Sequence, residues 1–178
     1  MIASTTTLRE IQVFPQPVQK PHPQIWEPLT SERSVRWAAQ RGINGYFIVE
    51  PNSRLRKNIE IYYDEAEKQG WPDRQNRGRF KYGWDAEKRR GIVTCRYIHV
   101  VEKGLGDLNR AAAAMELQWD YYGPFGFAAV LAEADEPMYD LNMKVTADLL
   151  RKKEVAIHGS KQYVIDTIRH HDRPVVWL

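Results

Sequence analysis

The stretch IVTCRYIHVV, residues 92–101, has the clearest strand pattern in the chain because it is rich in β-branched and aromatic residues. Shorter strands are predicted at residues 24–29 and 43–49 before it, and at residues 174–178 at the end of the sequence. Helical segments separate these strands. Such an alternation is typical of βα units, so the sequence predicts an α/β fold with about four parallel strands.

Five segments have helix patterns. The first follows Thr30 and Ser31, places Val35, Ala38 and Ala39 on one face, and ends before a glycine that suits a helix C-terminus. The other four are predicted at about residues 53–69, 107–121, 137–153 and 160–171. The polar segment between the second helix and the strand at residues 92–101 is broken by proline and glycine and is predicted to be a loop.

Composition limits the classes of protein to consider. With 178 residues, 43% of them hydrophobic, the chain can form one domain with a sizeable core. Its formal charge of +3 comes from basic clusters mixed with acidic residues, which argues against a nucleic-acid partner. The composition therefore favours a globular protein that acts on, or binds, something other than nucleic acid.

Cysteine content and hydropathy indicate in which cellular compartment the protein is expected. Cys95 is the one cysteine in the sequence, so no intramolecular disulfide can form, and a reducing compartment fits. No apolar run approaches the ~20 residues of a membrane span, and the first residues lack a signal-peptide pattern. We therefore expect a cytoplasmic protein without a membrane partner.

Four prolines lie in the run PQPVQKPHPQIW, residues 15–26, which predicts a stiff, extended connector. This run, the turn TSERS and the segment VRWAAQRGINGYFI resemble part of the luciferase-like flavin monooxygenase family, in which a proline-rich lead-in precedes a barrel strand. The segments IYYDEAEKQGWP, VTCRYIHVVE and AIHGSKQYVIDTI are also similar to that family. The resemblance extends over about residues 13–168.

The resemblance implies a TIM-barrel fold, which typically needs ~250 residues. All the matching segments belong to the back half of the family, so we expect a partial barrel at residues 13–178 after a flexible segment at residues 1–12. A half-barrel leaves strand edges and apolar surface exposed. We therefore expect either a homo-oligomer or a partner chain that completes the barrel.

The same resemblance implies an activity. Family members use reduced FMN and O₂ to oxygenate a small organic substrate, and a flavin reductase can supply the reduced cofactor. A deazaflavin is the alternative cofactor. Two other interpretations remain open: a non-catalytic flavin-binding or interaction protein, as one half of a split barrel or a degenerate remnant, and an unrelated small α/β protein.

Candidate binding residues lie at two helix starts. Thr30, Ser31 and Ser34 stand between a strand and a helix, where free backbone N–H groups attract anions, and the resemblance implies that this turn holds the FMN phosphate. The alternative is simple capping of the helix by a hydroxyl. Gly159 and Ser160 form a second candidate turn by the same physics, with a plain helix start as the alternative.

Two further sets of residues are candidates for catalysis and substrate binding. His99 lies near the end of its strand, on the face shared with Cys95 and Tyr97, and is the catalytic candidate, with a structural histidine as the alternative. Tyr122 and Phe125 are the candidates for a substrate pocket, within an aromatic cluster whose alternative roles are core packing and an oligomer contact. No histidines and carboxylates have metal-ligand spacing, so no metal site is predicted.

Overall fold

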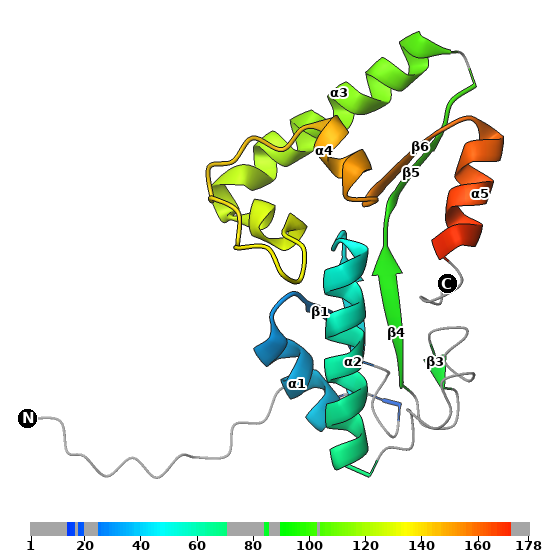
Figure 1. Ribbon diagram of the computed structural model, residues 1–178. Helices are drawn as coiled ribbons and strands as arrows, with labels where there is room; N and C mark the ends of the chain where they lie inside the picture. The colour runs from blue at the N-terminus through cyan, green and yellow to red at the C-terminus, as the bar shows by residue number, and fades with distance from the viewer. Residues whose placement is uncertain are drawn as a thin grey trace, which may run out of the picture.

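The computed structural model describes residues 14–16, 18–19, 25–70, 84–85, 90–102 and 104–171. The segment predicted to be flexible, most of the proline connector and the strand predicted at residues 174–178 lie outside these ranges. The described part has a mixed α/β fold in which helices and short, mostly parallel strands alternate, as the sequence predicts (Figure 1).

The first sheet is built by successive strand–helix units. Strand β1 (Trp26–Leu29), helix α1 (Glu32–Gln40), strand β2 (Asn44–Ile48), helix α2 (Asn52–Lys68) and strand β4 (Arg90–Cys95) follow one another along the chain. The spatial order is β1-β2-β4-β3, in which β1, β2 and β4 are parallel and the short β3 (Trp84–Asp85) is antiparallel to β4. The carboxyl ends of β1, β2 and β4 therefore lie at one edge of the sheet.

Strand β5 (Tyr97–Val100) continues the path of β4 into a second, two-stranded sheet (Figure 1). It pairs in parallel with β6 (Ala156–Gly159), so that His99 lies opposite His158. Between these strands the chain forms α3 (Leu105–Tyr122), two 3₁₀ helices, η2 (Gly123–Phe125) and η3 (Phe127–Leu131), and α4 (Ala147–Lys152). Helix α5 (Lys161–His171) follows β6 and packs against both strands of this sheet.

Two apolar clusters hold these parts together. The first lies between the first sheet and α1 and α2, and its fully buried members include Leu29, Phe47 and Tyr62. The second contains Trp119 and Leu131 with other residues of α3, η3, α4 and β6. Each large side chain that is fully buried contributes about 1.5–3 kcal/mol of hydrophobic stabilisation. The two clusters meet at the carboxyl end of β2.

Most predicted elements are confirmed, with three differences in the strands. The two residues of β3 lie in the segment predicted to be a loop, most of which is outside the described ranges. The strand predicted at residues 92–101 is interrupted at Arg96, and its two halves pair with different partners, β2 and β6. Strand β6 is not predicted from the sequence. It follows α4 after only a short turn, and its four residues are too few to show a strand period. The described strands form two open sheets rather than a closed barrel.

The helix predicted at residues 137–153 is wrong over most of its length, because only Ala147–Lys152 is helical. Upstream, the Asp140 side chain accepts from the N–H of Asn142 at 2.7 Å, and its carbonyl accepts from the N–H of Met143 at 3.0 Å. Aspartate side chains compete with the helix in this way. Thr146 then caps α4 by accepting from the N–H of Leu149 at 3.2 Å, which fixes the late start.

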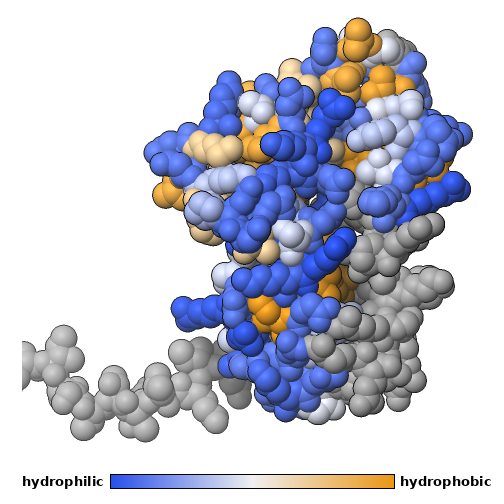
Figure 2. Space-filling view, viewed as in Figure 1, coloured by the Kyte–Doolittle hydropathy of each residue, from blue (hydrophilic) through white to orange (hydrophobic). Residues whose placement is uncertain are grey.

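The surface alternates hydrophilic and hydrophobic areas. Figure 2 shows hydrophobic side chains gathered mainly over the part that holds α3 and the 3₁₀ helices, with a smaller patch over the helices of the first sheet. Large exposed side chains of α3 and η2 include Leu117, Tyr121 and Phe125. No helix in the described ranges has both the length and the hydropathy that crossing a bilayer requires.

Candidate functional site

A hollow of about 310 Å³ lies at the carboxyl end of β1, where the first sheet meets the 3₁₀ helices. Ligands of open parallel sheets characteristically bind beyond the carboxyl ends of the strands. Polar and apolar side chains share the lining, which consists of Thr30, Ser31, Arg54, Phe125, Gly126, Phe127, Ala129, Val130 and Met138. The hollow thus contains Thr30, Ser31 and Phe125, three of the residues that the sequence singles out.

The serines at the start of α1 form a reciprocal capping box. The Ser31 hydroxyl accepts from the N–H of Ser34 at 3.1 Å, and the Ser34 hydroxyl accepts from the N–H of Ser31 at 3.2 Å. The Ser34 hydroxyl also donates to the Ser31 carbonyl at 2.8 Å. Capping is therefore the structural role of both hydroxyls. Ser31 also lines the hollow, whereas Ser34 faces a neighbouring depression with Trp37.

The aromatic wall of the hollow depends on the turn at Gly126. This residue has φ of +75°, which favours glycine, and a Cβ there would stand 2.8 Å from Leu141 Cδ2. The turn joins η2 to η3 and leaves Phe125 and Phe127 on the hollow with 66% and 41% of their surfaces exposed. Tyr122 packs behind Phe127, with ring centroids 5.2 Å apart, and supports the wall instead of lining it.

Arg54 in α2 supplies positive charge to the hollow, and the sequence analysis missed it. One terminal nitrogen, Nη2, donates to the Thr30 carbonyl at 3.2 Å, and Nη1 lies 3.7 Å from Met138 Sδ. Its side chain is 18% exposed, so the guanidinium is held at the rim and is not free in solvent. Arg54 therefore connects the carboxyl end of β1 with the segment that follows η3.

Glu50 lies behind Arg54 and is completely buried at the carboxyl end of β2. Its Oε2 accepts from the Asn58 amide at 2.8 Å, and its Oε1 lies 3.9 Å from Arg54 Nε. Burial raises the pKa of Glu50 to about 7, against the hydrogen bond from Asn58 and the charges of Arg54 and Arg96, which lower it. A carboxyl group inside the protein is therefore poised to change charge near neutral pH.

The sequence contains a signal that points to these residues. Glu50 directly follows the apolar strand at residues 43–49, and charged residues at the carboxyl ends of parallel strands commonly serve a site. Glu50, Arg54 and Asn58 are spaced four residues apart, which places them along one side of a helix and of the residues just before it. This spacing could have identified the cluster before the structure.

Arg96 occupies the interruption between β4 and β5. Its guanidinium donates to the Cys95 carbonyl at 2.8 Å, to the Thr94 hydroxyl at 3.2 Å and to the Asn52 side chain at 3.1 Å. Burial lowers the pKa of Arg96 to about 10, although nearby Glu50 opposes this change. The Cys95 thiol donates to the Tyr46 hydroxyl at 3.1 Å, which gives the cysteine a structural partner.

His99 lies in the second sheet, outside the lining of the hollow. Its Nε2 is 3.5 Å from Asp107 Oδ2, and its ring centroid is 5.9 Å from that of His158. His158 is 2% exposed, and burial together with nearby His99 lowers its pKa. The structure therefore pairs the catalytic candidate with another histidine and not with the candidate binding residues.

The second candidate turn, at Gly159 and Ser160, also lies away from the hollow. The Ser160 hydroxyl accepts from the N–H of Tyr163 at 3.2 Å at the start of α5. Tyr163 packs so closely over Gly159 that a Cβ there would stand 2.5 Å from Tyr163 Cδ1. These contacts form a helix start beneath an aromatic ring.

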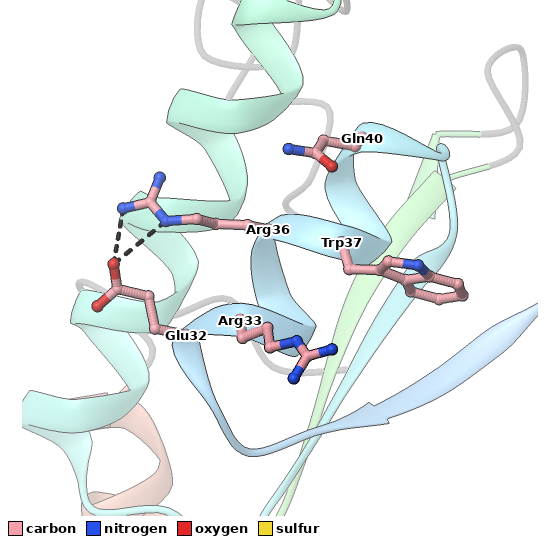
Figure 3. Close-up of a pocket in the computed structure, with 5 residues that line it drawn as sticks. All are labelled: Glu32, Arg33, Arg36, Trp37 and Gln40. Carbon is pink, nitrogen blue, oxygen red and sulfur yellow. Dashed lines mark hydrogen bonds and ion pairs between the residues drawn. The ribbon is translucent and has the colours of Figure 1, made fainter.

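Another depression, of about 480 Å³, lies along α1 (Figure 3). All of its lining residues come from this one helix: Glu32, Arg33, Arg36, Trp37 and Gln40. Arg36 is paired with Glu32 at 2.7 Å, and Arg41 stacks 4.7 Å from the Trp37 ring centroid. Arg36 and Gln40 also donate hydrogen bonds to Glu65 of α2, so these two side chains take part in the packing of the two helices. Because all of the lining belongs to α1, this depression is a groove on a helix surface.

Metal ligands are not grouped in this protein within the described ranges, where no three side chains of His, Cys, Asp or Glu could hold an ion together. The hollow next to Arg54 combines a cation, hydroxyls and aromatic rings, which suits an anion attached to a flat apolar group.

No protein-family model matches the chain, and no curated protein matches it.

Proposed function

We propose that the chain is part of a flavin-dependent monooxygenase related to the luciferase-like family, and that the hollow holds the phosphate end of reduced FMN. The observation that supports this proposal is the convergence of Ser31, Arg54 and Phe125 on one hollow at the carboxyl end of a parallel strand. Thr30 and Ser31 remain as binding residues, and Arg54 joins them.

The donor set fits this cofactor. The Arg54 guanidinium can bind a phosphate in charge-assisted hydrogen bonds, and the Ser31 hydroxyl lies on the same hollow. Phe125 and Phe127 present exposed apolar surface beside the proposed phosphate site, which can contact the apolar part of the cofactor. A hollow of about 310 Å³ is near the lower limit for ligand pockets, so it fits the phosphate end and does not enclose the whole cofactor.

The rest of the site would come from another chain. The unit β1–α1–β2–α2–β4 has the parallel pairing of consecutive barrel strands, which is the basis for proposing a partial TIM barrel. Either a second copy or a different chain would complete the sheet and cover the cofactor. Bound reduced FMN supplies the chemistry that activates O₂, while the residues of this chain position it, balance its phosphate charge and exclude water.

A flavin titration tests this proposal. The purified protein is titrated with FMN, first oxidised and then anaerobically reduced, with flavin fluorescence and oligomeric mass recorded on the same samples. We expect binding in one or both redox states, and about tenfold weaker binding for Arg54→Met, because a charge-assisted hydrogen bond is lost. Oxygen consumption with an added flavin reductase then separates an active enzyme from a flavin-binding protein.

Arg56→Met is the matched control, because Arg56 is exposed on the same helix and outside the lining of the hollow. It should bind FMN as the unmodified protein does. If Arg54→Met and Arg56→Met weakened FMN binding equally, the loss of net charge would explain the effect, and Arg54 would have no specific contact with the phosphate. No binding of FMN in any oligomeric state would contradict the proposal and favour an interaction protein without a flavin.

A further inference from the structure

We infer that binding of an anion in the hollow is coupled to uptake of a proton by Glu50, so that the site binds anions more tightly as the pH falls. The inference rests on the proposed function, because it takes the hollow to be an anion site. It goes beyond that proposal by adding a regulatory residue, Glu50, which does not line the hollow.

A single side chain connects the buried carboxyl group with the hollow. Arg54 directs Nε towards Glu50 Oε1, at 3.9 Å, while Nη2 reaches the Thr30 carbonyl at the rim, at 3.2 Å. The same guanidinium therefore interacts with the interior charge on one side and faces the ligand space on the other. A change in the charge of Glu50 alters how much of the positive charge of Arg54 is available to a ligand.

The hydrogen bonds around Glu50 leave its charge only partly stabilised. Among the described residues, neither Glu50 Oε1 nor Arg54 Nε has a hydrogen-bond partner, so charge alone links the two groups. In the described part of the chain, Asn58 is the one hydrogen-bond donor to this carboxyl group. Because a buried carboxylate with so few donors is costly, the neutral form is within reach near neutral pH, as the pKa of about 7 indicates.

The charges that face Glu50 come from two elements. Arg54 approaches it from α2, and Arg96 approaches it from the junction of β4 and β5. On the other side of Arg96, Glu154 accepts from the Asn52 side chain at 2.6 Å and adds negative charge to the cluster. Arg96 and Glu154 do not line the hollow, so Arg54 is the cation that a ligand and Glu50 share.

Linkage gives the direction of the effect. An anion beside Arg54 repels the Glu50 carboxylate and favours its protonated form, so binding removes a proton from solvent and places it on the carboxyl group. By reciprocity, protonated Glu50 leaves the charge of Arg54 uncompensated and strengthens anion binding. No bond other than this O–H bond forms, and no electron is transferred.

Calorimetric titration with 2-naphthalenesulfonate tests the coupling. Its sulfonate stays ionised between about pH 6 and pH 8.5, so any pH dependence in that range belongs to the protein. The naphthalene ring suits the apolar wall of Phe125 and Phe127. We expect about tenfold tighter binding at pH 6 than at pH 8.5, with proton uptake seen as a heat that depends on the buffer.

Glu50→Gln should bind the probe with little dependence on pH and at the tight level that the unmodified protein reaches in acid. Glu65→Gln is the matched control, because Glu65 is the buried carboxyl group at the other end of α2 and lies outside the hollow. It should keep the pH dependence. Asn58→Leu should move the midpoint of the pH dependence upwards, because it removes the hydrogen bond that favours the carboxylate.

The outcomes separate this inference from the proposed function. Binding that Arg54→Met weakens, but that takes up no proton and keeps the same affinity across the pH range, overturns the role of Glu50 and leaves the anion site intact. An affinity for the probe that still depends on pH in Glu50→Gln also overturns it. No binding of the probe at any pH overturns both. If Glu50→Gln fails to fold, Asn58→Leu decides the question: an unchanged midpoint of the pH dependence in that variant overturns the role of Glu50.

Discussion

Helix α2 has a buried carboxyl group at each end, Glu50 just before its first turn and Glu65 in its last turns, and the two groups are held differently. Glu65 receives hydrogen bonds from Gln40 at 2.9 Å and from Arg36 and Lys68, each at 3.3 Å. The hydrogen bond from Gln40 has the largest effect in lowering the pKa of Glu65, and Lys68 and Arg36 lower it further. Glu50 accepts a hydrogen bond from Asn58 alone among the described residues, and burial raises its pKa to about 7.

Burial is the largest influence on the pKa of Glu50, whereas at Glu65 the hydrogen bonds outweigh burial. Glu65 lies between α1 and α2, where long side chains reach it from both helices. Glu50 lies at the carboxyl end of β2, close to where the two apolar clusters meet. One end of α2 is thus arranged for stability, and the other retains a group that can change charge.

The largest effect expected from this comparison is in the pH dependence of stability. The folded pKa of Glu50 lies above its ordinary value of 4.5, so stability is highest below that value and falls as pH rises towards about 7. The loss amounts to about 3 kcal/mol. Urea unfolding of Glu50→Gln at about pH 5 and pH 8 should show that this loss has disappeared.

Glu65→Gln provides the opposite case. Its lowered pKa gives stability that is present above the ordinary value of 4.5 and is lost in more acidic solution, so its difference from the unmodified protein should be constant between about pH 5 and pH 8. His158 also titrates, but it is present in all three proteins and cancels in the differences. An equal pH slope in Glu50→Gln and the unmodified protein would contradict the state assigned to Glu50.

A smaller effect should come from removing one donor at each end of α2. Asn58→Leu takes away the hydrogen bond to Glu50 and should cost about 2 kcal/mol at pH 8, where the carboxyl group is charged, and less at pH 5. Gln40→Leu removes one of several donors to Glu65 and should cost about 1 kcal/mol at both pH values. Urea midpoints at the two pH values measure both costs.

The ratio of the stability losses in Asn58→Leu and Gln40→Leu tests whether the two carboxyl groups are held differently. If Gln40→Leu proved as costly as Asn58→Leu at pH 8, the remaining donors, Arg36 and Lys68, would not be compensating for the lost bond. If Asn58→Leu cost the same at both pH values, Glu50 would not be changing charge between them.

The local elements could be predicted from the sequence because each has a local cause. The apolar face of α1, the glycine after it and the β-branched run at residues 92–101 specify their elements within a few residues. The interruption at Arg96 depends on which strands pair with the two halves, which is a tertiary property. The non-helical segment before α4 depends on hydrogen bonds of Asp140 that compete with helix formation.

The candidate site was only partly predictable for the same reason. Thr30 and Ser31 stand at a junction that is visible in the sequence, and Phe125 belongs to a visible aromatic cluster. Their meeting depends on how the segment around η2 and η3 folds back over β1, which no local pattern encodes. Whether Arg54 or Arg56 faces the hollow likewise depends on the rotation of α2 against the sheet.

The smallest effect concerns the starts of α1 and α2, which also differ. Helix α1 begins with a side-chain cap, whereas α2 begins after Pro51 without one. Ser31→Ala and Ser34→Ala each remove part of the capping box of α1 and should each cost about 1 kcal/mol in urea unfolding.

Flavin binding by this pair of variants separates capping from ligand contact. Ser31 lines the hollow and Ser34 does not, so the proposed phosphate contact predicts weaker FMN binding for Ser31→Ala and unchanged binding for Ser34→Ala, although both lose similar stability. Equal affinities in the two variants would limit both serines to capping α1. The phosphate would then be bound by Arg54, with the Ser31 hydroxyl making no direct contribution.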